Sequence, residues 1–191
     1  MRLSTKIFLA LLPLAAGAAL GAKEKSTDQT LLLGDRRVTI AVPDGYIYSS
    51  GRDDQGVIMV QIADAREKIT LQVRFQPDPD SRRGAESQQM AYLAEICQQY
   101  AEGSVEKSYD FKPLAPRHGA GTYCAFTDAS LVGREPPKGE FRNVTTGVKA
   151  WPGWALVFTI LSNDTDSKEY LTALRLLQDS FEEKPAAAPK M

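Results

Sequence analysis

The chain has 191 residues, with 23 lysines and arginines against 24 aspartates and glutamates and a formal net charge of −1. This balance gives no basic field of the kind that nucleic-acid binders present, so we expect no nucleic-acid partner. The single histidine, His118, excludes a zinc site built on two or more imidazoles, and Cys97 and Cys124 lack the spacing of a Cys/His zinc motif. We therefore expect no metal and no other cofactor.

The chain begins with the three parts of a secretory signal peptide. The cations Arg2 and Lys6 precede an apolar run over 7–14, and small residues follow up to Ala22. The apolar run is too short to cross a bilayer as a helix. We predict cleavage near Gly21 or Ala22 and a periplasmic or secreted protein. Because no cysteine stands at the cleavage region, we expect no lipid anchor, and because no second apolar run is long enough, we expect no membrane span.

The rest of the chain is long enough for one domain with a core of its own. Its first residues, 23–29, are polar, and we predict a flexible segment there. The last residues, 184–191, are rich in proline and alanine, and this composition predicts a disordered tail. We expect a single α+β domain over 30–183.

Four strands are predicted before the first helix. The segments 31–33 and 38–42 form a hairpin around Gly34-Asp35, and Pro43-Asp44-Gly45 ends the second strand. Further strands follow over 58–62 and 69–75. Apolar and polar residues alternate cleanly over 69–75, which indicates an antiparallel sheet covered on one side only.

The second half of the chain predicts two helices separated by three strands. A helix over 86–102 ends at Gly103, and a strand covers 122–131. The hairpin 141–161 turns at Pro152-Gly153. A last helix begins near Asp166, with Glu169 at capping-box spacing. The expected buried stripes are Met90, Leu93, Cys97 and Tyr100 in the first helix and Tyr170, Leu174, Leu177 and Phe181 in the second.

The element order β-β-β-β-α-β-β-β-α predicts an α+β fold, a curved antiparallel sheet of six to seven strands with two helices packed on it. This order is similar to that of the PsbP/Mog1-like family, as are the corner Val42-Pro43-Asp44-Gly45-Tyr46 and the closing helix that ends in Ser180-Phe181. The resemblance implies an α-β-α sandwich that acts as a binding or assembly module, and bacterial members of this group are often secreted. It brings no catalytic residue with it.

Cys97 and Cys124 are expected to face each other across the layer between helix and sheet. Cys97 lies on the apolar stripe of its helix, and Cys124 shares a strand face with Phe126. An oxidising compartment and an even cysteine count favour a disulfide between them. The alternative is two independent buried thiols. A catalytic redox pair is disfavoured because the sequence has no Cys-x-x-Cys.

Aromatic residues gather at two predicted strand ends. Tyr46 and Tyr48 follow the Pro-Asp-Gly corner, and Trp151 and Trp154 flank the Pro-Gly turn. Such residues are candidate contacts for a small ligand or a protein partner, since they bury large areas at low entropic cost. The alternative is that they cap the ends of the sheet core.

The sequence contains no motif that indicates a particular enzymatic reaction. The loop around His118 is rich in glycine, as in the oxyanion loops of some hydrolases, but the sequence has no Gly-x-Ser-x-Gly. Asp78 and Asp80 lack the register of an EF-hand calcium loop and indicate a turn. We therefore expect no enzyme and no catalytic residue, but a binding or accessory module of the bacterial cell envelope that takes an envelope protein or a small ligand. The alternative is a small secreted hydrolase with its active site around His118.

Overall fold

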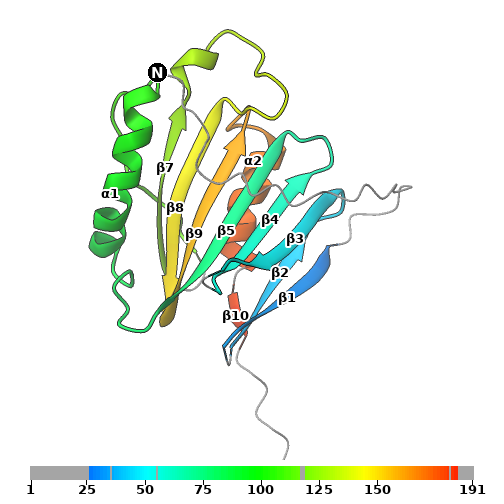
Figure 1. Cartoon of the computed structure of the whole chain (residues 1–191), viewed down its shortest axis with the longest axis vertical. Coiled ribbons are helices and arrows are strands. Elements are labelled where there is room, and N and C mark those ends of the chain that lie inside the picture. The colour runs from blue at the N-terminus through cyan, green and yellow to red at the C-terminus, as the bar shows by residue number, and fades with distance from the viewer. Residues whose placement is uncertain (1–25, 35, 55, 117–118, 181, 185–191) are drawn as a thin grey trace, which may run out of the picture.

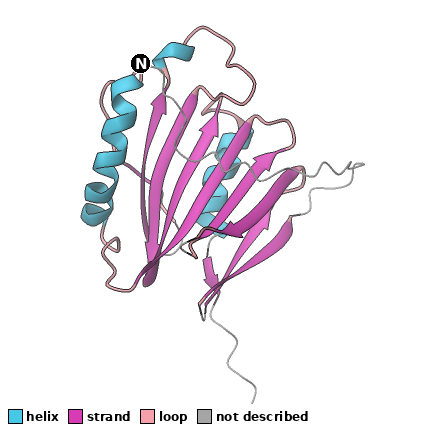
Figure 2. Ribbon diagram, viewed as in Figure 1, coloured by secondary structure: helices cyan, strands magenta, loops and turns pink. Residues whose placement is uncertain are grey.

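The computed structural model describes residues 26–34, 36–54, 56–116, 119–180 and 182–184. Within these residues the chain forms two sheets and two α-helices, and the large sheet is antiparallel throughout (Figures 1 and 2). Its strands, in spatial order, are β3 (Tyr46–Arg52), β4 (Ile58–Asp64), β5 (Ile69–Asp78), β9 (Gly153–Ser162), β8 (Asn143–Trp151), β7 (Ala120–Thr127) and β6 (Lys112–Pro113). The predicted α+β class and a seven-stranded antiparallel sheet are confirmed, but the predicted strands 31–33 and 38–42 do not belong to this sheet.

A second, three-stranded sheet joins the two ends of the described chain. Its order is β1 (Thr27–Leu33), β2 (Arg36–Val42) and β10 (Glu182–Lys184). The predicted hairpin is confirmed by the antiparallel pairing of β1 with β2, in which Leu33 lies opposite Arg36. Gly34 enters the turn at a φ of 66°, a conformation that costs glycine little.

Helix α1 (Glu86–Gly103) begins at Ala85, whose backbone N–H donates to the Gln88 side chain at 3.0 Å. Helix α2 (Lys168–Arg175) begins at Ser167, whose hydroxyl accepts the Tyr170 N–H at 3.2 Å. The predicted start near Asp166 is right to within one residue, but the predicted capping pair of Asp166 and Glu169 is wrong, because Ser167 occupies the capping position. A π-helical turn (Leu176–Ser180) continues α2 toward β10.

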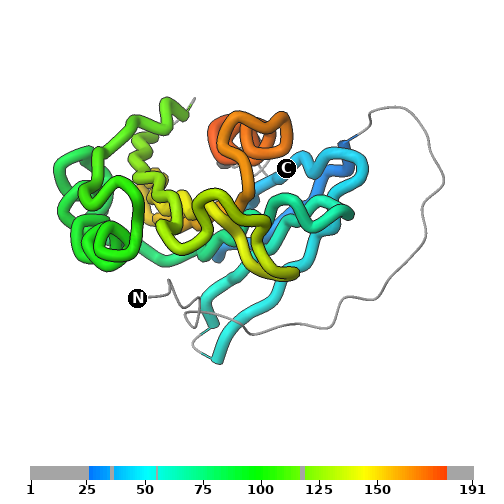
Figure 3. The backbone as a smooth tube through the Cα atoms, turned by 90° about the horizontal axis from the view of Figure 1, so that it is seen from above, coloured from blue at the N-terminus to red at the C-terminus, as the bar shows by residue number. Residues whose placement is uncertain are grey.

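The two faces of the large sheet are covered differently. On one face, apolar residues of β4, β5 and β9 pack against α2, the π-helical turn and the small sheet, and together they form the main core. Helix α1 packs on the other face against β7 and β8. Figure 1 shows α2 behind the large sheet, and Figure 3 shows α1 and α2 as separate layers from above. This arrangement is an α-β-α sandwich in which α1 covers only part of its face.

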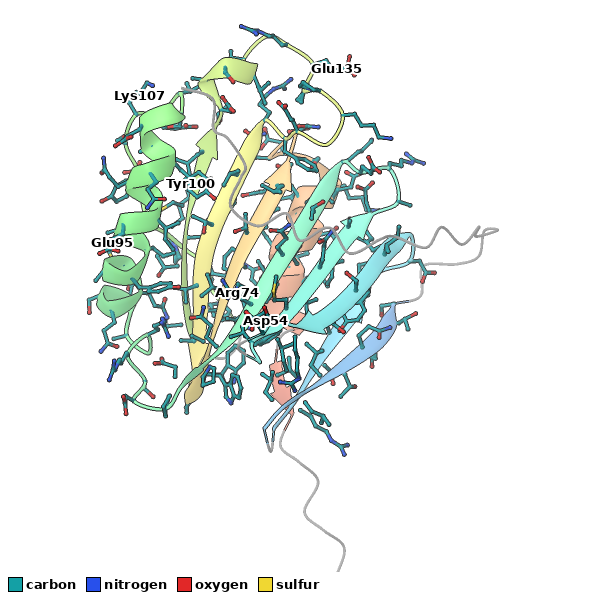
Figure 4. All side chains as sticks on the ribbon, in the orientation of Figure 1. Asp54, Arg74, Glu95, Tyr100, Lys107 and Glu135 are labelled. Atoms are coloured by element: carbon teal, nitrogen blue, oxygen red, sulfur yellow. The ribbon has the colours of Figure 1, made fainter. Side chains whose placement is uncertain are left out.

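The uncovered part of that face is seen best on β5. Thr70, Gln72, Arg74 and Gln76 are all half-exposed there, as the alternation predicted. Figure 4 shows Arg74 on this face of the sheet. The prediction of a sheet covered on one side only is thus right for β5 but wrong for β7 and β8, because α1 covers them.

Several boundaries differ from the sequence prediction. The segment 23–29 was expected to be flexible, but residues 27–29 pair with β2, since backbone hydrogen bonds need no apolar side chains. Strands β3, β6 and β10 were not predicted. Lys184, assigned to the tail, is the last residue of β10. The strand predicted to reach residue 131 ends at Thr127, and the short 3₁₀ helix Ala129–Leu131 follows it. The signal peptide, Phe181 and the rest of the tail lie outside the described residues.

Candidate functional site

A groove at the mouth between the two sheets brings Tyr46 and Tyr48 together. Its volume is about 440 Å³, within the range of ordinary small-ligand sites. It is lined by Thr27 and Gln29 of β1, Val42 at the end of β2, the corner Pro43, Asp44 and Gly45, and Tyr46 and Tyr48 of β3. We call it the inter-sheet groove.

The sequence Pro43-Asp44-Gly45 explains the turn at the corner of the inter-sheet groove. Pro43 accepts a hydrogen bond from the Tyr46 N–H at 3.2 Å, which closes a four-residue turn. Gly45 lies at a φ of 83°, which residues with a side chain rarely adopt. The Gly45 carbonyl accepts the Ala65 N–H at 3.0 Å and so ties the corner to the loop after β4. The turn therefore starts β3 in a fixed place.

Tyr46 lines the groove and also forms a hydrogen bond with Thr172 of helix α2. Burial raises the pKa of the Tyr46 hydroxyl, and the negative charges of Asp64 and Glu169 raise it further. A hydrogen bond with the Thr172 side chain acts in the opposite direction. Tyr46 is therefore a neutral hydrogen-bonding group at physiological pH, in a region where two carboxylates act on it.

The structure does not bring the tryptophans to this groove. Trp151 and Trp154 face each other at the turn between β8 and β9, at the end of the sheet opposite Tyr46. Trp151 is only 7% exposed, and its ring lies edge-on to Phe75 with centroids 6.4 Å apart. Trp151 thus caps the core. Trp154 lines a second cavity of only about 80 Å³, which is small for an organic ligand.

The two cysteines meet between α1 and β7. Both are fully buried, and their side chains approach to 2.7 Å. The predicted proximity is confirmed, and the structure holds both as free thiols without the predicted bond. The contact with Cys124, together with burial, raises the pKa of the Cys97 thiol, so Cys97 keeps its proton. Neither thiol is placed to react with a molecule in solvent.

Half-buried aromatic residues surround this thiol pair. Tyr92, Ile96 and Tyr100 each precede a buried residue of α1, so they form a stripe beside the buried one. Tyr100 stacks on Phe126 with ring centroids 5.6 Å apart. Figure 4 shows Tyr100 on the sheet side of α1 and Glu95 on the outer side. The aromatic packing keeps water away from the thiols.

The remaining candidates have structural roles or lie outside the described residues. Asp78 is buried and accepts the N–H groups of Arg82 and Arg83 at 3.0 and 2.9 Å, which confirms a turn at this place. Across the described part of the chain, no group of three or more histidine, cysteine, aspartate or glutamate side chains is placed to hold a metal ion. No described helix is both long and apolar enough to cross a membrane. His118 is among the residues that are not described.

The sequence missed two kinds of residue. Asp44, Thr27 and Gln29 line the inter-sheet groove, but only the Pro-Asp-Gly corner gave a signal for it. Lys149 is 1% exposed in the middle of β8, and nothing in its strand marks it as buried.

Neither the protein-family models nor the curated proteins contain a match to this chain.

Proposed function

We propose that the protein is a non-catalytic binding module of the bacterial cell envelope, periplasmic or secreted, and that it binds a small ligand at the inter-sheet groove. One observation carries the proposal: the groove, of about 440 Å³, gathers Tyr46 and Tyr48 with the polar groups of Thr27, Gln29 and Asp44. Aromatic faces supply contact area, and a few convergent polar groups fix a ligand's orientation. The signal peptide predicted from 1–22 supports the location.

The fold supports this role because both walls of the groove are built from paired strands. One wall comes from β1 and β2 and the other from β3, and each wall is hydrogen-bonded into its own sheet. A preformed site binds with little loss of conformational entropy. The α-β-α arrangement is also what the resemblance to the PsbP/Mog1-like family implies, and members of that family act as binding or assembly modules.

The proposal is tested by a ligand screen with matched variants. Amino acids, amines, saccharides, nucleotides and short peptides are tested by thermal shift, and hits are measured by calorimetry. We expect a hit whose affinity falls about tenfold or more in Tyr48→Ala, because a central aromatic contact contributes more than about 1 kcal/mol. Tyr109→Ala removes a half-buried tyrosine that does not line the groove, and affinity stays unchanged. Hits that bind Tyr46→Ala and Tyr48→Ala as well as the unaltered protein contradict the proposal.

We also propose that Cys97 and Cys124 form a disulfide in an oxidising compartment. During folding, before α1 covers them, the two thiols lose two protons and two electrons to the disulfide of a thiol oxidase, which leaves as a dithiol. The 2.7 Å approach of the side chains brings the partners together. The bond would tie α1 to β7, and in the chain-entropy model a loop of this length stabilises the fold by roughly 3–4 kcal/mol.

Thiol counting tests this bridge. Protein purified from the periplasm without reductant is denatured and alkylated, and we expect mass spectrometry to show no alkylated cysteine. Reduction before alkylation makes both cysteines react. Cys97→Ser serves as the control, since Cys124 then has no partner and reacts without reductant. Two alkylated cysteines in the unreduced protein contradict the bridge.

A further inference from the structure

Strand β3 is an open edge of the large sheet. It is the last strand in the spatial order (Figure 1), and β4 is its one hydrogen-bonded neighbour among the described strands. None of its seven residues is fully buried. An edge strand of this kind presents a row of unpaired backbone N–H and C=O groups, which is a template for pairing with another chain.

The hydrogen bonds to β4 show which backbone groups of β3 are unpaired. The Gly45 carbonyl accepts the Ala65 N–H at 3.0 Å just before β3 begins, and just after β3 ends the Asp53 N–H donates to the next strand's side at 3.0 Å. Bonded and non-bonded pairs alternate in an antiparallel ladder, so the odd-numbered residues of β3 bond to β4. No ladder or turn of the described residues uses the N–H and C=O groups of the even-numbered residues Tyr48, Ser50 and Arg52.

Strand β3 lacks the features that ordinarily protect a sheet edge. The opposite edge strand, β6, has only two residues, and one of them is Pro113. By contrast, β3 has seven residues without a proline, and its register with β4 has no bulge. Its single charged residue, Arg52, is its last. Short edges, prolines, bulges and charges are the devices that prevent pairing, so β3 is left open to a further strand.

The inter-sheet groove lies on this free side of β3. Its lining includes Tyr46 and Tyr48 but no residue of β4, and the other lining residues come from β1, the end of β2 and the corner. A strand paired with β3 would therefore run into the groove, and every second side chain of that strand would point to the same face as these tyrosines. An open edge beside a pocket is the arrangement of peptide sites in which main-chain hydrogen bonds give affinity and alternate side chains give specificity.

We infer that the ligand of the inter-sheet groove is an extended peptide segment of a protein partner, which adds a strand to the large sheet beside β3. The inference rests on the proposed function and names the chemical class of its ligand. The peptide backbone bonds to the free groups of Tyr48, Ser50 and Arg52. Its alternate side chains reach the lining that Thr27 and Gln29 provide.

A second copy of the chain fits this edge less well than a peptide. Two β3 edges would meet over a contact about 24 Å long and about 10 Å thick, which buries roughly 500 Å² in total. Stable interfaces between proteins bury about 1,200 Å² or more. A single extended segment needs no such area outside the strand, because it also fills the groove.

Methylation of alternate peptide nitrogens tests the pairing. A display library of random linear peptides is selected on the protein, and the tightest binder is synthesised with N-methyl groups on its odd or on its even residues. We expect one analogue to keep its affinity and the other to lose about tenfold or more, because only every second peptide N–H faces β3. Equal affinities of the two analogues, or a library without any binder, overturn the peptide inference.

Amide hydrogen exchange locates the bound peptide. In the free protein we expect slow exchange at the odd-numbered residues of β3 and fast exchange at Tyr48, Ser50 and Arg52. The peptide slows exchange at these three residues about tenfold or more. Slow exchange there without peptide, at high protein concentration alone, assigns the edge to a second copy and overturns the peptide inference.

A proline variant completes the test. Ser50→Pro removes one outward N–H and no bond to β4, so the strand stays paired and the peptide binds about tenfold more weakly. Glu86→Pro is the control, since proline is tolerated at the first residue of α1 after the extended Ala85, and peptide binding stays unchanged. Equal binding by the two variants overturns the peptide inference. Small molecules that bind the groove when no peptide does also overturn it and support the proposed function, whereas a ligand screen without hits overturns the proposed function.

Discussion

Lys149 carries a charge at a place where the fold admits almost no water. The side chain is 1% exposed, and its ammonium donates hydrogen bonds to the Leu177 carbonyl at 2.9 Å and to the Gln178 carbonyl at 3.5 Å. Both carbonyls belong to the π-helical turn after α2, where the negative end of the helix dipole attracts a cation. Lys149 therefore fastens this turn to strand β8.

Replacing Lys149 by methionine tests that role. Lys149→Met keeps the length of the side chain and leaves the Leu177 carbonyl without this donor, so we expect the free energy of unfolding to fall by about 1–3 kcal/mol. Urea denaturation followed by circular dichroism measures it. Lys68→Met is the matched control, since that exposed lysine should change stability by less than about 0.5 kcal/mol. Equal stability of the two variants contradicts the role.

At the scale of single residues, the sequence predicts burial or exposure only as far as the type of side chain determines it. Tyr46 and Tyr48 were predicted as candidate contacts because aromatic residues bury large areas at low entropic cost, and the structure packs both against the main core, so their role as contacts stays a prediction. Trp151 satisfied the same criterion and proved to be core, since the criterion cannot tell which end of a sheet stays open. Lys149 was missed because a lysine in a strand ordinarily faces water.

Elements were predictable where periodicity and turn chemistry agreed. The β8–β9 hairpin turns at Pro152-Gly153, with Gly153 at a φ of 84°. Strand β3 was missed because Tyr46–Arg52 lies at the sheet edge, where no residue is fully buried and polar residues occupy both faces. β6 and β10 have two and three residues, too few for any periodicity.

Strand β8 depends on a glycine for its packing. A Cβ at Gly147 would meet the Phe158 ring and would lie 2.7 Å from the Thr122 carbonyl oxygen. A backbone oxygen in a paired strand cannot move away cheaply, so the strands must shift. Gly147 thus lets Phe158 fill the core directly beside β8.

Alanine substitution tests this packing. Gly147→Ala should lower the free energy of unfolding by about 1–3 kcal/mol through overpacking. Gly51→Ala is the control, because nothing lies within 4 Å of its Cβ position and its φ is not positive. Denaturant unfolding of both variants measures the difference. A Gly147→Ala protein that unfolds at the same denaturant concentration as Gly51→Ala shows that Phe158 adapts and refutes the argument.

At the scale of the whole molecule, the layers were predictable and the small sheet was not. Alternating strands and two amphipathic helices define an antiparallel sheet with helices on it. No local pattern indicates that β10 pairs with β2, because the partners come from opposite ends of the chain. The inter-sheet groove was unpredictable for the same reason: its walls belong to two sheets whose separation is a tertiary property.

The small sheet cannot be completed until the end of the chain has been synthesised, because its third strand is β10. The ribosome releases β1 and β2 first, and a pair distant in sequence forms only when both partners have emerged. Until then β1 and β2 are a two-stranded hairpin, which is marginally stable in water. The nascent chain therefore keeps the wall that carries Thr27 and Gln29 unfinished until its last strand arrives, and the inter-sheet groove is among the last parts of the protein to form.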